Sequence, residues 1–204
     1  TFAQSVDVVS YEFENIPTTA LDIIEAHCPI HPGRKALQIS QDRLVEKQFL
    51  QDLGLKTAPF MAVDTPTDLQ AALDCTGAPA ILKTRRFGYD GKGQQRINGI
   101  NDTAQAFENL AGAPAILEGF VNFQLEISVI GARGQDGQVA CFDPGQNMHE
   151  NGILHKTIVP APISASQRAD AVLAAGHILN ALDYVGVMGV EFFVTPRGLV
   201  VNEI

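Results

Sequence analysis

The residues best suited to chemistry are a lysine and a glycine-rich loop that follow one short apolar run. Lys83 lies near the end of the run Ala80–Thr84, and the loop Arg86–Gln94 comes directly after it. Glycines let backbone N–H groups approach an anion closely, and a lysine ammonium is a mobile point charge suited to phosphate. The sequence therefore predicts a loop that closes over a triphosphate, although a plain glycine-rich hairpin turn has the same composition.

Two glutamates near the end of the chain are placed as metal ligands. A hairpin around Pro196-Arg197 puts Glu191 and Glu203 nearly opposite each other on adjacent strands. Glu191 lies in a strongly apolar stretch, where an unpaired carboxylate is costly. Magnesium prefers a few carboxylates together with phosphate oxygens and water. We therefore expect Glu191 and Glu203 to hold Mg2+, with Asn202 contributing from the same segment.

Composition indicates a globular chain and excludes several classes of partner. The 204 residues are 46% hydrophobic and 18% charged, with a net charge of −9. This charge disfavours nonspecific binding to nucleic acid or an anionic membrane. The 3 cysteines show no metal-ligand spacing, so reduced thiols in a cytoplasmic protein are expected. The chain begins at Thr1 and ends within a strand-like run at Ile204, so we expect a piece of a longer protein, cut at both ends.

Hydrophobic periodicity predicts a mixed architecture that positions these residues. A β-α-β-β-α-β unit is expected over residues 58–121, with the glycine loop between its two middle strands. An antiparallel β portion with one helix, Ser164 to Tyr184, follows. A strand is expected at 7–10, and a helix with Ser40 as N-cap is expected to end before Gly54. The order predicts an α+β fold and not a Rossmann repeat, and no Walker or kinase motif is present.

Several of these features, taken in order, resemble the ATP-grasp fold over about residues 40 to 204. The order is Lys83, the glycine loop, Glu118-Gly-Phe-Val121, Glu126, Glu191 and Asn202-Glu203. The resemblance implies that a nucleotide lies between two α+β subdomains and that two acidic residues near the end of the second subdomain hold magnesium.

Five motifs are similar to one branch of that fold, the 5-(carboxyamino)imidazole ribonucleotide synthases of purine biosynthesis. They are Tyr11-Glu-Phe-Glu14, Gln41-Asp-Arg-Leu44, Lys83-Thr-Arg85, Gly88-Tyr-Asp-Gly-Lys-Gly-Gln94 and Leu125-Glu-Ile-Ser-Val129. The segment Phe87-Gly-Tyr-Asp-Gly91 distinguishes this branch from two other ATP-grasp enzymes. The formate-using glycinamide ribonucleotide transformylase has a serine-rich loop at this place, and biotin carboxylase has a run of glycines. The resemblance implies four segments: the end of a preATP-grasp α/β domain (1–33), a linking helix region (34–57), subdomain 1 with loop 88–94 (58–121) and an incomplete subdomain 2 (122–204).

The resemblance also implies a role for each site residue. Lys83 would contact the α- and β-phosphates and Arg43 a phosphate, although Arg43 could equally lie on a solvated helix face. Glu126 would accept from the ribose hydroxyls, and His149 would lie beside the nucleotide, unless it is an exposed loop histidine. The loop Gly88, Tyr89, Asp90, Gly91, Lys92, Gly93 and Gln94 would close over the β,γ-phosphates, and Glu118, Gly119, Phe120 and Val121 would form the adenine hinge. Tyr89, Asp90 and Glu12 would face the second substrate, aminoimidazole ribonucleotide.

The family reaction consumes ATP, bicarbonate and 5-aminoimidazole ribonucleotide. It passes through carboxyphosphate and gives N5-carboxyaminoimidazole ribonucleotide, ADP and phosphate, and it needs no side-chain nucleophile. The resemblance implies a homodimer for the full-length protein. Two alternatives stay open from the sequence: another ATP-grasp carboxylate–amine ligase, and a nucleotide-binding module without catalysis.

Overall fold

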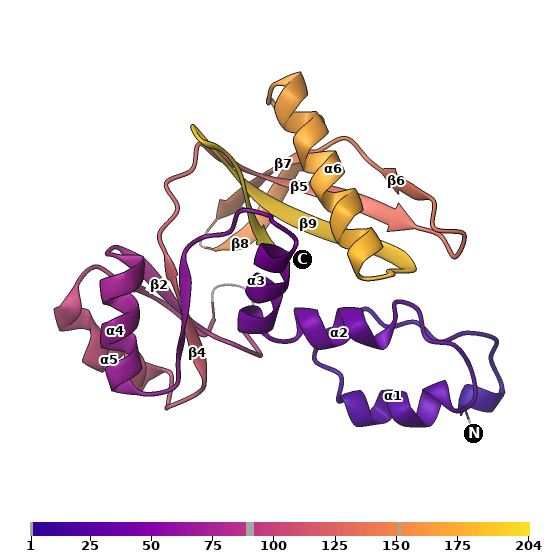
Figure 1. Ribbon diagram of the computed structural model, residues 1–204, viewed down its shortest axis with the longest axis horizontal. Helices are drawn as coiled ribbons and strands as arrows, with labels where there is room; N and C mark the ends of the chain where they lie inside the picture. The colour runs from indigo at the N-terminus through magenta and orange to yellow at the C-terminus, as the bar shows by residue number, and fades with distance from the viewer. Residues whose placement is uncertain (1, 89–91, 151) are drawn as a thin grey trace.

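The computed structural model describes residues 2–88, 92–150 and 152–204. Two β-sheets with their helices lie on either side of helix α3 (Arg43–Asp52), and an N-terminal segment with α1 (Thr18–Glu25) and α2 (Arg34–Ser40) extends beside them (Figure 1). In the part of the chain that is described, no helix has the length and apolarity that crossing a membrane requires.

The first sheet is the predicted β-α-β-β-α-β unit. Its strands β1 (Phe60–Val63), β2 (Ala80–Thr84), β3 (Gln94–Ile97) and β4 (Ala115–Gly119) pair antiparallel in the order β1-β4-β2-β3. Helices α4 (Pro66–Thr76) and α5 (Thr103–Asn109) cover one face and bury an apolar core of Val63, Leu69, Leu82, Ile97 and Leu117. The glycine loop runs from β2 to β3, as the sequence predicts.

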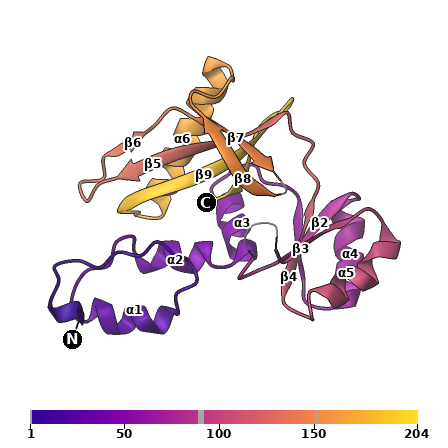
Figure 2. The same ribbon diagram turned by 180° about the vertical axis from the view of Figure 1, so that it is seen from behind.

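The second sheet follows the order β10-β9-β5-β7-β8, with the short β6 (Val139–Cys141) on β5 (Leu125–Arg133). Its other strands are β7 (Gly145–Glu150), β8 (Ile153–Ile158), β9 (Gly186–Thr195) and β10 (Gly198–Glu203). Helix α6 (Ala165–Ala181) packs on one face over Ile127, Val129, Val190 and Phe192. Figure 2, from behind, shows α6 beyond the sheet with β7 and β8 in front of it. The candidate functional site lies on the other face of this sheet.

Two local predictions are wrong. Ser40 is not an N-cap: it is the last residue of α2, and Asp42 caps α3 by accepting from the N–H groups of Leu44 and Val45. The strand expected at 7–10 is reduced, within the described residues, to one bridge between Val9 and Ile30. Strand β7 was not predicted, because its sequence Gly145-Gln-Asn-Met-His-Glu150 has neither alternation nor β-branched residues.

The segment after α3 joins the two sheets. Thr57 forms a bridge with Val201, and the Val201 N–H donates to the Lys56 carbonyl at 2.8 Å. Strand β1 begins three residues further on, at Phe60. The chain therefore touches the last strand of the second sheet before it enters the first one, which fixes α3 at the boundary between the two sheets.

Candidate functional site

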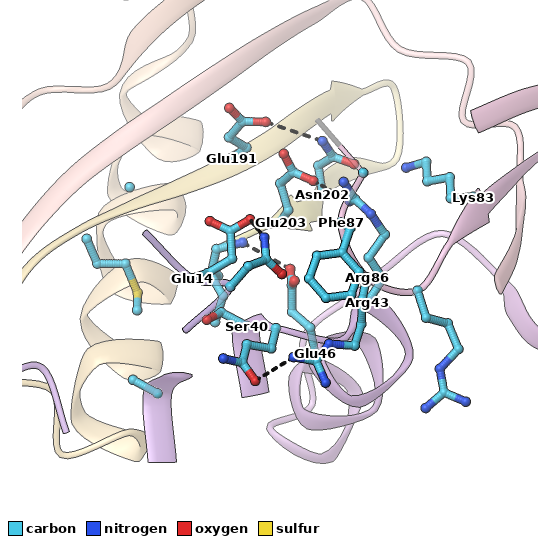
Figure 3. Close-up of a pocket in the computed structure, with 18 of the residues that line it drawn as sticks. Glu14, Ser40, Arg43, Glu46, Lys83, Arg86, Phe87, Glu191, Asn202 and Glu203 are labelled. Carbon is cyan, nitrogen blue, oxygen red and sulfur yellow. Dashed lines mark hydrogen bonds and ion pairs between the residues drawn. The ribbon is translucent and has the colours of Figure 1, made fainter. Parts of the chain in front are cut away.

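A cleft of about 780 Å3 lies between the two sheets and the N-terminal segment. It contains most of the predicted site residues, and Figure 3 shows Glu191, Asn202 and Glu203 on one side of it with Lys83 on the other. The predicted residues that line it are Glu12, Arg43, Lys83, Gly88, Lys92, Gln94, Glu126, His149, Glu191, Asn202 and Glu203. The predicted hinge, Glu118 to Val121, lies outside this lining. Tyr89, Asp90 and Gly91 lie outside the described residues.

The two glutamates are direct partners across the terminal hairpin. Glu191 of β9 pairs in register with Glu203 of β10, after a bulge between Val201 and Glu203. The Asn202 amide donates to Glu191 Oε2 at 3.3 Å. Burial, followed by the charges of Glu203 and Glu126, raises the pKa of Glu191 to about 7. This carboxylate therefore sits where its negative charge is disfavoured until a cation arrives.

Glu203 has the opposite electrostatic setting. Its Oε2 accepts from Arg43 Nη1 at 2.7 Å. Burial opposes ionisation, but Arg43 outweighs it and lowers the pKa of the Glu203 carboxyl below its usual range. Arg43 consequently does not lie on a solvated helix face. It brings a guanidinium beside the acidic pair, in a position to bind a phosphate as well.

The acidic pair fits a magnesium ion that takes some of its ligands from phosphate. In residues 2–88, 92–150 and 152–204, no group of three or more His, Cys, Asp or Glu side chains forms a complete protein cage. A divalent cation between Glu191 and Glu203 would therefore take its remaining ligands from phosphate oxygens and water, as Mg2+ does readily. Its charge would also offset the burial and the repulsion by Glu203 and Glu126 that together raise the pKa of Glu191.

Lys83 is held by Glu118, a residue that was expected in the adenine hinge. Lys83 Nζ donates to Glu118 Oε2 at 2.9 Å, and Lys47 Nζ lies 3.8 Å from the other oxygen, Oε1. Burial raises the pKa of Glu118, but Lys83 and then Lys47 overcome this effect and hold it below its usual range. The Glu118 side chain is 6% exposed. In this structure the Glu118 carboxylate therefore binds Lys83, and its contact with adenine stays a prediction.

The rest of the predicted hinge is partly engaged within the fold. The N–H groups of Gly119 and Phe120 donate to the carbonyls of Pro59 and Pro79 at 2.8 and 3.0 Å. These two N–H groups are thus unavailable to a base. An adenine edge at this position would have to be read by carbonyl groups or by Val121.

Glu126 and His149 lie together on neighbouring strands. Glu126 Oε1 is 3.6 Å from His149 Nε2 and accepts from Asn147 Nδ2 at 3.4 Å. Burial raises the pKa of Glu126, while His149 acts in the opposite direction. His149 belongs to β7 and not to a loop, so the unpredicted strand delivers it to the cleft.

Both described ends of the glycine loop pack against Thr84. Gly93 has φ +70°, and a Cβ there would meet Thr84 Oγ1 at 2.6 Å. A Cβ at Gly88 would meet the same oxygen at 3.2 Å. Glycine is needed at position 93 because of its positive φ and because of this close contact. The base of the loop therefore packs its backbone closely against the Thr84 side chain.

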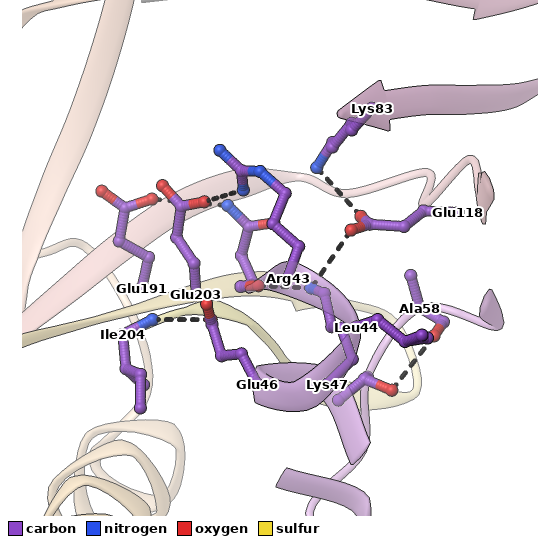
Figure 4. A network of polar contacts seen from close by, with 12 residues as sticks. Arg43, Leu44, Glu46, Lys47, Ala58, Lys83, Glu118, Glu191, Glu203 and Ile204 are labelled. Atoms are coloured by element: carbon purple, nitrogen blue, oxygen red, sulfur yellow. Dashed lines mark hydrogen bonds and ion pairs between the residues drawn. The ribbon is translucent and has the colours of Figure 1, made fainter. Parts of the chain in front are cut away.

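Charged residues of α3 and its N-cap, to which the sequence assigned no role, support the site. Lys47 and Glu46 of α3 are 2% and 3% exposed. Glu46 accepts from the Ile204 N–H at 3.0 Å (Figure 4), and Lys47 donates to the Asn202 carbonyl. Burial raises the pKa of Glu46 to about 8 and lowers the pKa of Lys47. Asp42, besides capping α3, binds Arg85 through both carboxylate oxygens at 2.7–3.0 Å.

Comparison with known proteins settles the family. Residues 48–204 match the ATP-grasp domain, and residues 1–41 match the ribonucleotide synthetase preATP-grasp domain. The chain belongs to the ATP-grasp family. The predicted α+β, ATP-grasp architecture is confirmed, whereas the boundaries assigned to the four segments stay predictions.

Among ATP-grasp proteins, this chain is similar to N5-carboxyaminoimidazole ribonucleotide synthases. It is 50% identical to that of Brucella melitensis biotype 1, over 98% of this chain and 56% of the relative. The crystal structure of the Thermus thermophilus synthetase superposes with a TM-score of 0.92 at 42% identity, over 99% of this chain and 55% of that one. The Aspergillus clavatus synthase, solved with ADP and 5-aminoimidazole ribonucleotide, superposes with a TM-score of 0.90 at 27% identity, over 98% of this chain and 53% of that one. The chain spans about half the length of the curated relatives it matches.

Proposed function

We propose that the whole protein to which this chain belongs carboxylates 5-aminoimidazole ribonucleotide at the expense of ATP. Bicarbonate would be the carbon source, and N5-carboxyaminoimidazole ribonucleotide, ADP and phosphate the products, as a step of purine biosynthesis. The similar synthases carry this activity in their names, and one of them was solved with ADP and 5-aminoimidazole ribonucleotide.

One observation in this chain carries the proposal: the acidic pair faces cationic side chains across a single cleft. Glu191 and Glu203 lie opposite each other on β9 and β10, with Arg43 on one carboxylate at 2.7 Å. Lys83 and the base of the glycine loop line the same cleft from the other sheet. Carboxylates that hold a cation, facing groups that hold phosphate, are what transfer of a phosphoryl group requires.

The proposed nucleotide site assigns a task to each element. Lys83 and Arg43 would neutralise phosphate oxygens, and the loop Gly88–Gln94 would cover the β- and γ-phosphates and exclude water. Glu126 would accept from the ribose hydroxyls. Glu191 and Glu203 would hold Mg2+, which supplies charge neutralisation on the phosphates when bound. Glu12, at the exposed rim of the cleft, would face the ribonucleotide.

The chemistry would proceed by positioning and charge neutralisation. A bicarbonate oxygen attacks the γ-phosphorus and displaces ADP, which gives carboxyphosphate. The C–O bond of carboxyphosphate then breaks and phosphate leaves, either as the exocyclic amine attacks the carboxyl carbon or beforehand, with release of carbon dioxide that the amine captures. In both cases the amine nitrogen forms the new N–C bond and gives up one proton to phosphate or solvent. Lys83 would offset the charge on the transferring phosphoryl group, and the closed loop would protect carboxyphosphate from water. No side chain needs to form a covalent bond.

The test is an ADP-release assay on the whole protein with ATP, bicarbonate and 5-aminoimidazole ribonucleotide, each omitted in turn. We expect release that depends on all three and is abolished by Glu203→Gln. Release with another carboxylate or another amine in place of these substrates would instead indicate a different carboxylate–amine ligase. Binding of magnesium–ATP without any release would indicate a nucleotide-binding module. Homodimer formation and a cytoplasmic location are further parts of the proposal, and sedimentation of the whole protein checks the first.

A further inference from the structure

One face of helix α3 holds the last three residues of the chain. Arg43, Glu46 and Lys47 stand at positions i, i+3 and i+4, which share a helix face. Arg43 binds the Glu203 carboxylate, Glu46 accepts from the Ile204 N–H, and Lys47 donates to the Asn202 carbonyl. The helix thus fixes the backbone and the side chain that carry half of the acidic pair.

Lys47 also reaches the other sheet. Its Nζ lies 3.8 Å from Oε1 of Glu118, and Glu118 Oε2 accepts from Lys83 at 2.9 Å. Within the described residues, Glu118 Oε1 is buried and has no hydrogen-bond partner. Lys47 is therefore the nearest cation to an otherwise unsatisfied oxygen. Figure 4 shows Lys47 and Lys83 on either side of Glu118. Because Lys47 also donates to the Asn202 carbonyl, it connects Lys83 on β2 to Asn202 on β10.

The charge balance of this group bears on how strongly Lys83 is held. One carboxylate, Glu118, faces two lysine side chains, so the trio carries one net positive charge when both lysines are protonated. Without Lys47, the carboxylate would be neutralised by Lys83 alone and would hold it more tightly, because a buried charge that loses a partner depends on the one that remains. Lys83 would then be less free to donate to a phosphate.

We propose that Lys47 is a positioning residue: it shares Glu118 with Lys83, so that Lys83 can turn to phosphate, and it fixes Asn202 beside Glu203. Lys47 does not line the cleft and would touch no substrate. It acts through its two neighbours, one from each half of the site. This inference rests on the proposed nucleotide site, and it adds a group to which the sequence assigned no role.

The experiment compares Lys47→Met with Lys47→Arg in the whole protein. The Met variant keeps the length of the side chain and removes the charge. We expect its KM for ATP to rise about tenfold, the loss of roughly one charge-assisted hydrogen bond to phosphate, with kcat reduced less than threefold. The Arg variant restores a cation near Glu118 and a donor near Asn202, and its KM should return to within threefold of the wild type.

Lys35→Met is the matched control. Lys35 also donates to a backbone carbonyl, that of Ala181, at 2.7 Å, but its side chain is exposed and does not line the cleft. Its loss should leave the KM for ATP unchanged. Urea unfolding of each variant separates a change in stability from a change in binding. Should Lys47→Met fail to fold, Lys47→Gln takes its place, since it keeps a polar donor without the charge.

A folded Lys47→Met or Lys47→Gln variant with a wild-type KM for ATP would overturn the inference, and so would an Arg variant that is as impaired as the neutral one. A purely structural role would lower the urea midpoint without changing KM. Failure of the proposed function is distinguishable, because wild-type protein would then release no ADP in response to bicarbonate and 5-aminoimidazole ribonucleotide.

Discussion

Replacing Glu191 by Gln should stabilise the metal-free chain at pH 8 while it weakens the binding of magnesium–nucleotide. Burial and the neighbouring Glu203 and Glu126 raise the pKa of Glu191 from its usual 4.5 to about 7. One pKa unit corresponds to about 1.36 kcal/mol, so ionised Glu191 costs the folded chain about 3 kcal/mol. Solvent screening of this half-buried side chain reduces the cost to about 2 kcal/mol. Gln removes the charge and keeps an oxygen that can accept from Asn202.

The sign of this effect follows from proton binding. The folded chain retains the Glu191 proton up to about pH 7, whereas the unfolded chain releases it near pH 4.5. The free energy of unfolding therefore falls as the pH rises between these values and is constant above them. The gain from Gln should be under about 1 kcal/mol at pH 5 and complete at pH 8.

Urea unfolding in EDTA at pH 5 and pH 8 measures this difference. We expect the midpoint of Glu191→Gln at pH 8 to rise by somewhat less than about 1 M, given the urea dependence typical of a chain of this size. Glu203→Gln is the control with the opposite sign, because it leaves Arg43 without its carboxylate. A Glu191→Gln variant no more stable than the wild type at pH 8, or equally stabilised at both pH values, would refute the reasoning.

Three further outcomes are expected. As the pH is raised toward 7, magnesium–nucleotide affinity should increase by up to tenfold per pH unit and then become constant above pH 7, because the cation displaces the Glu191 proton. Calorimetric titration across this pH range checks the prediction. A pH dependence of affinity that persists in Glu191→Gln would contradict it. Gly93→Ala, with φ +70° and a close contact, should weaken nucleotide binding several-fold. Gly77→Ala, with φ +79°, ψ 169° and open space, should cost about 2 kcal/mol of stability and leave binding unchanged. Asp42→Ala should cost about 2 kcal/mol in urea unfolding, since it removes the cap of α3 and the partner of Arg85; Asp42→Asn should cost distinctly less, and equal losses would contradict the separate role of the charge.

Local patterns were enough to predict the parts of the site that single elements determine. The apolar run before Lys83 identified a strand, and the glycines after it identified the loop. Counting outward from Pro196-Arg197 placed Glu191 opposite Glu203, and the observed register agrees, because a hairpin fixes the pairing of its arms. These predictions needed no contact between distant segments.

The missing parts depend on tertiary contacts. Glu46 and Lys47 are adjacent charges on an amphipathic helix, a pattern typical of a solvated face. Their burial follows from contacts with Asn202 and Ile204, more than 150 residues away. Glu118 was assigned to the adenine hinge, and its contacts with Lys83 and Lys47 were not predicted. Every residue of β4 is buried, so the sequence alternation could not show which charges surround Glu118.

Competition between equivalent local signals explains a second kind of miss. Ser40 and Asp42 are both good N-cap residues two positions apart, and the preference for Asp42 comes with its second partner, Arg85. Strand β7 has a polar sequence and is held by pairing with β5 and β8. In both cases a neighbouring element decides the local structure.

The most direct test of the account is calorimetric titration of magnesium–ATP into the 204-residue chain, with a parallel titration in EDTA and a third into the Glu191→Gln, Glu203→Gln double variant. The account predicts binding by the wild type that is lost in EDTA and at least tenfold weaker in the double variant. Equal affinity in all three titrations would contradict the claim that this acidic pair holds the metal of a nucleotide.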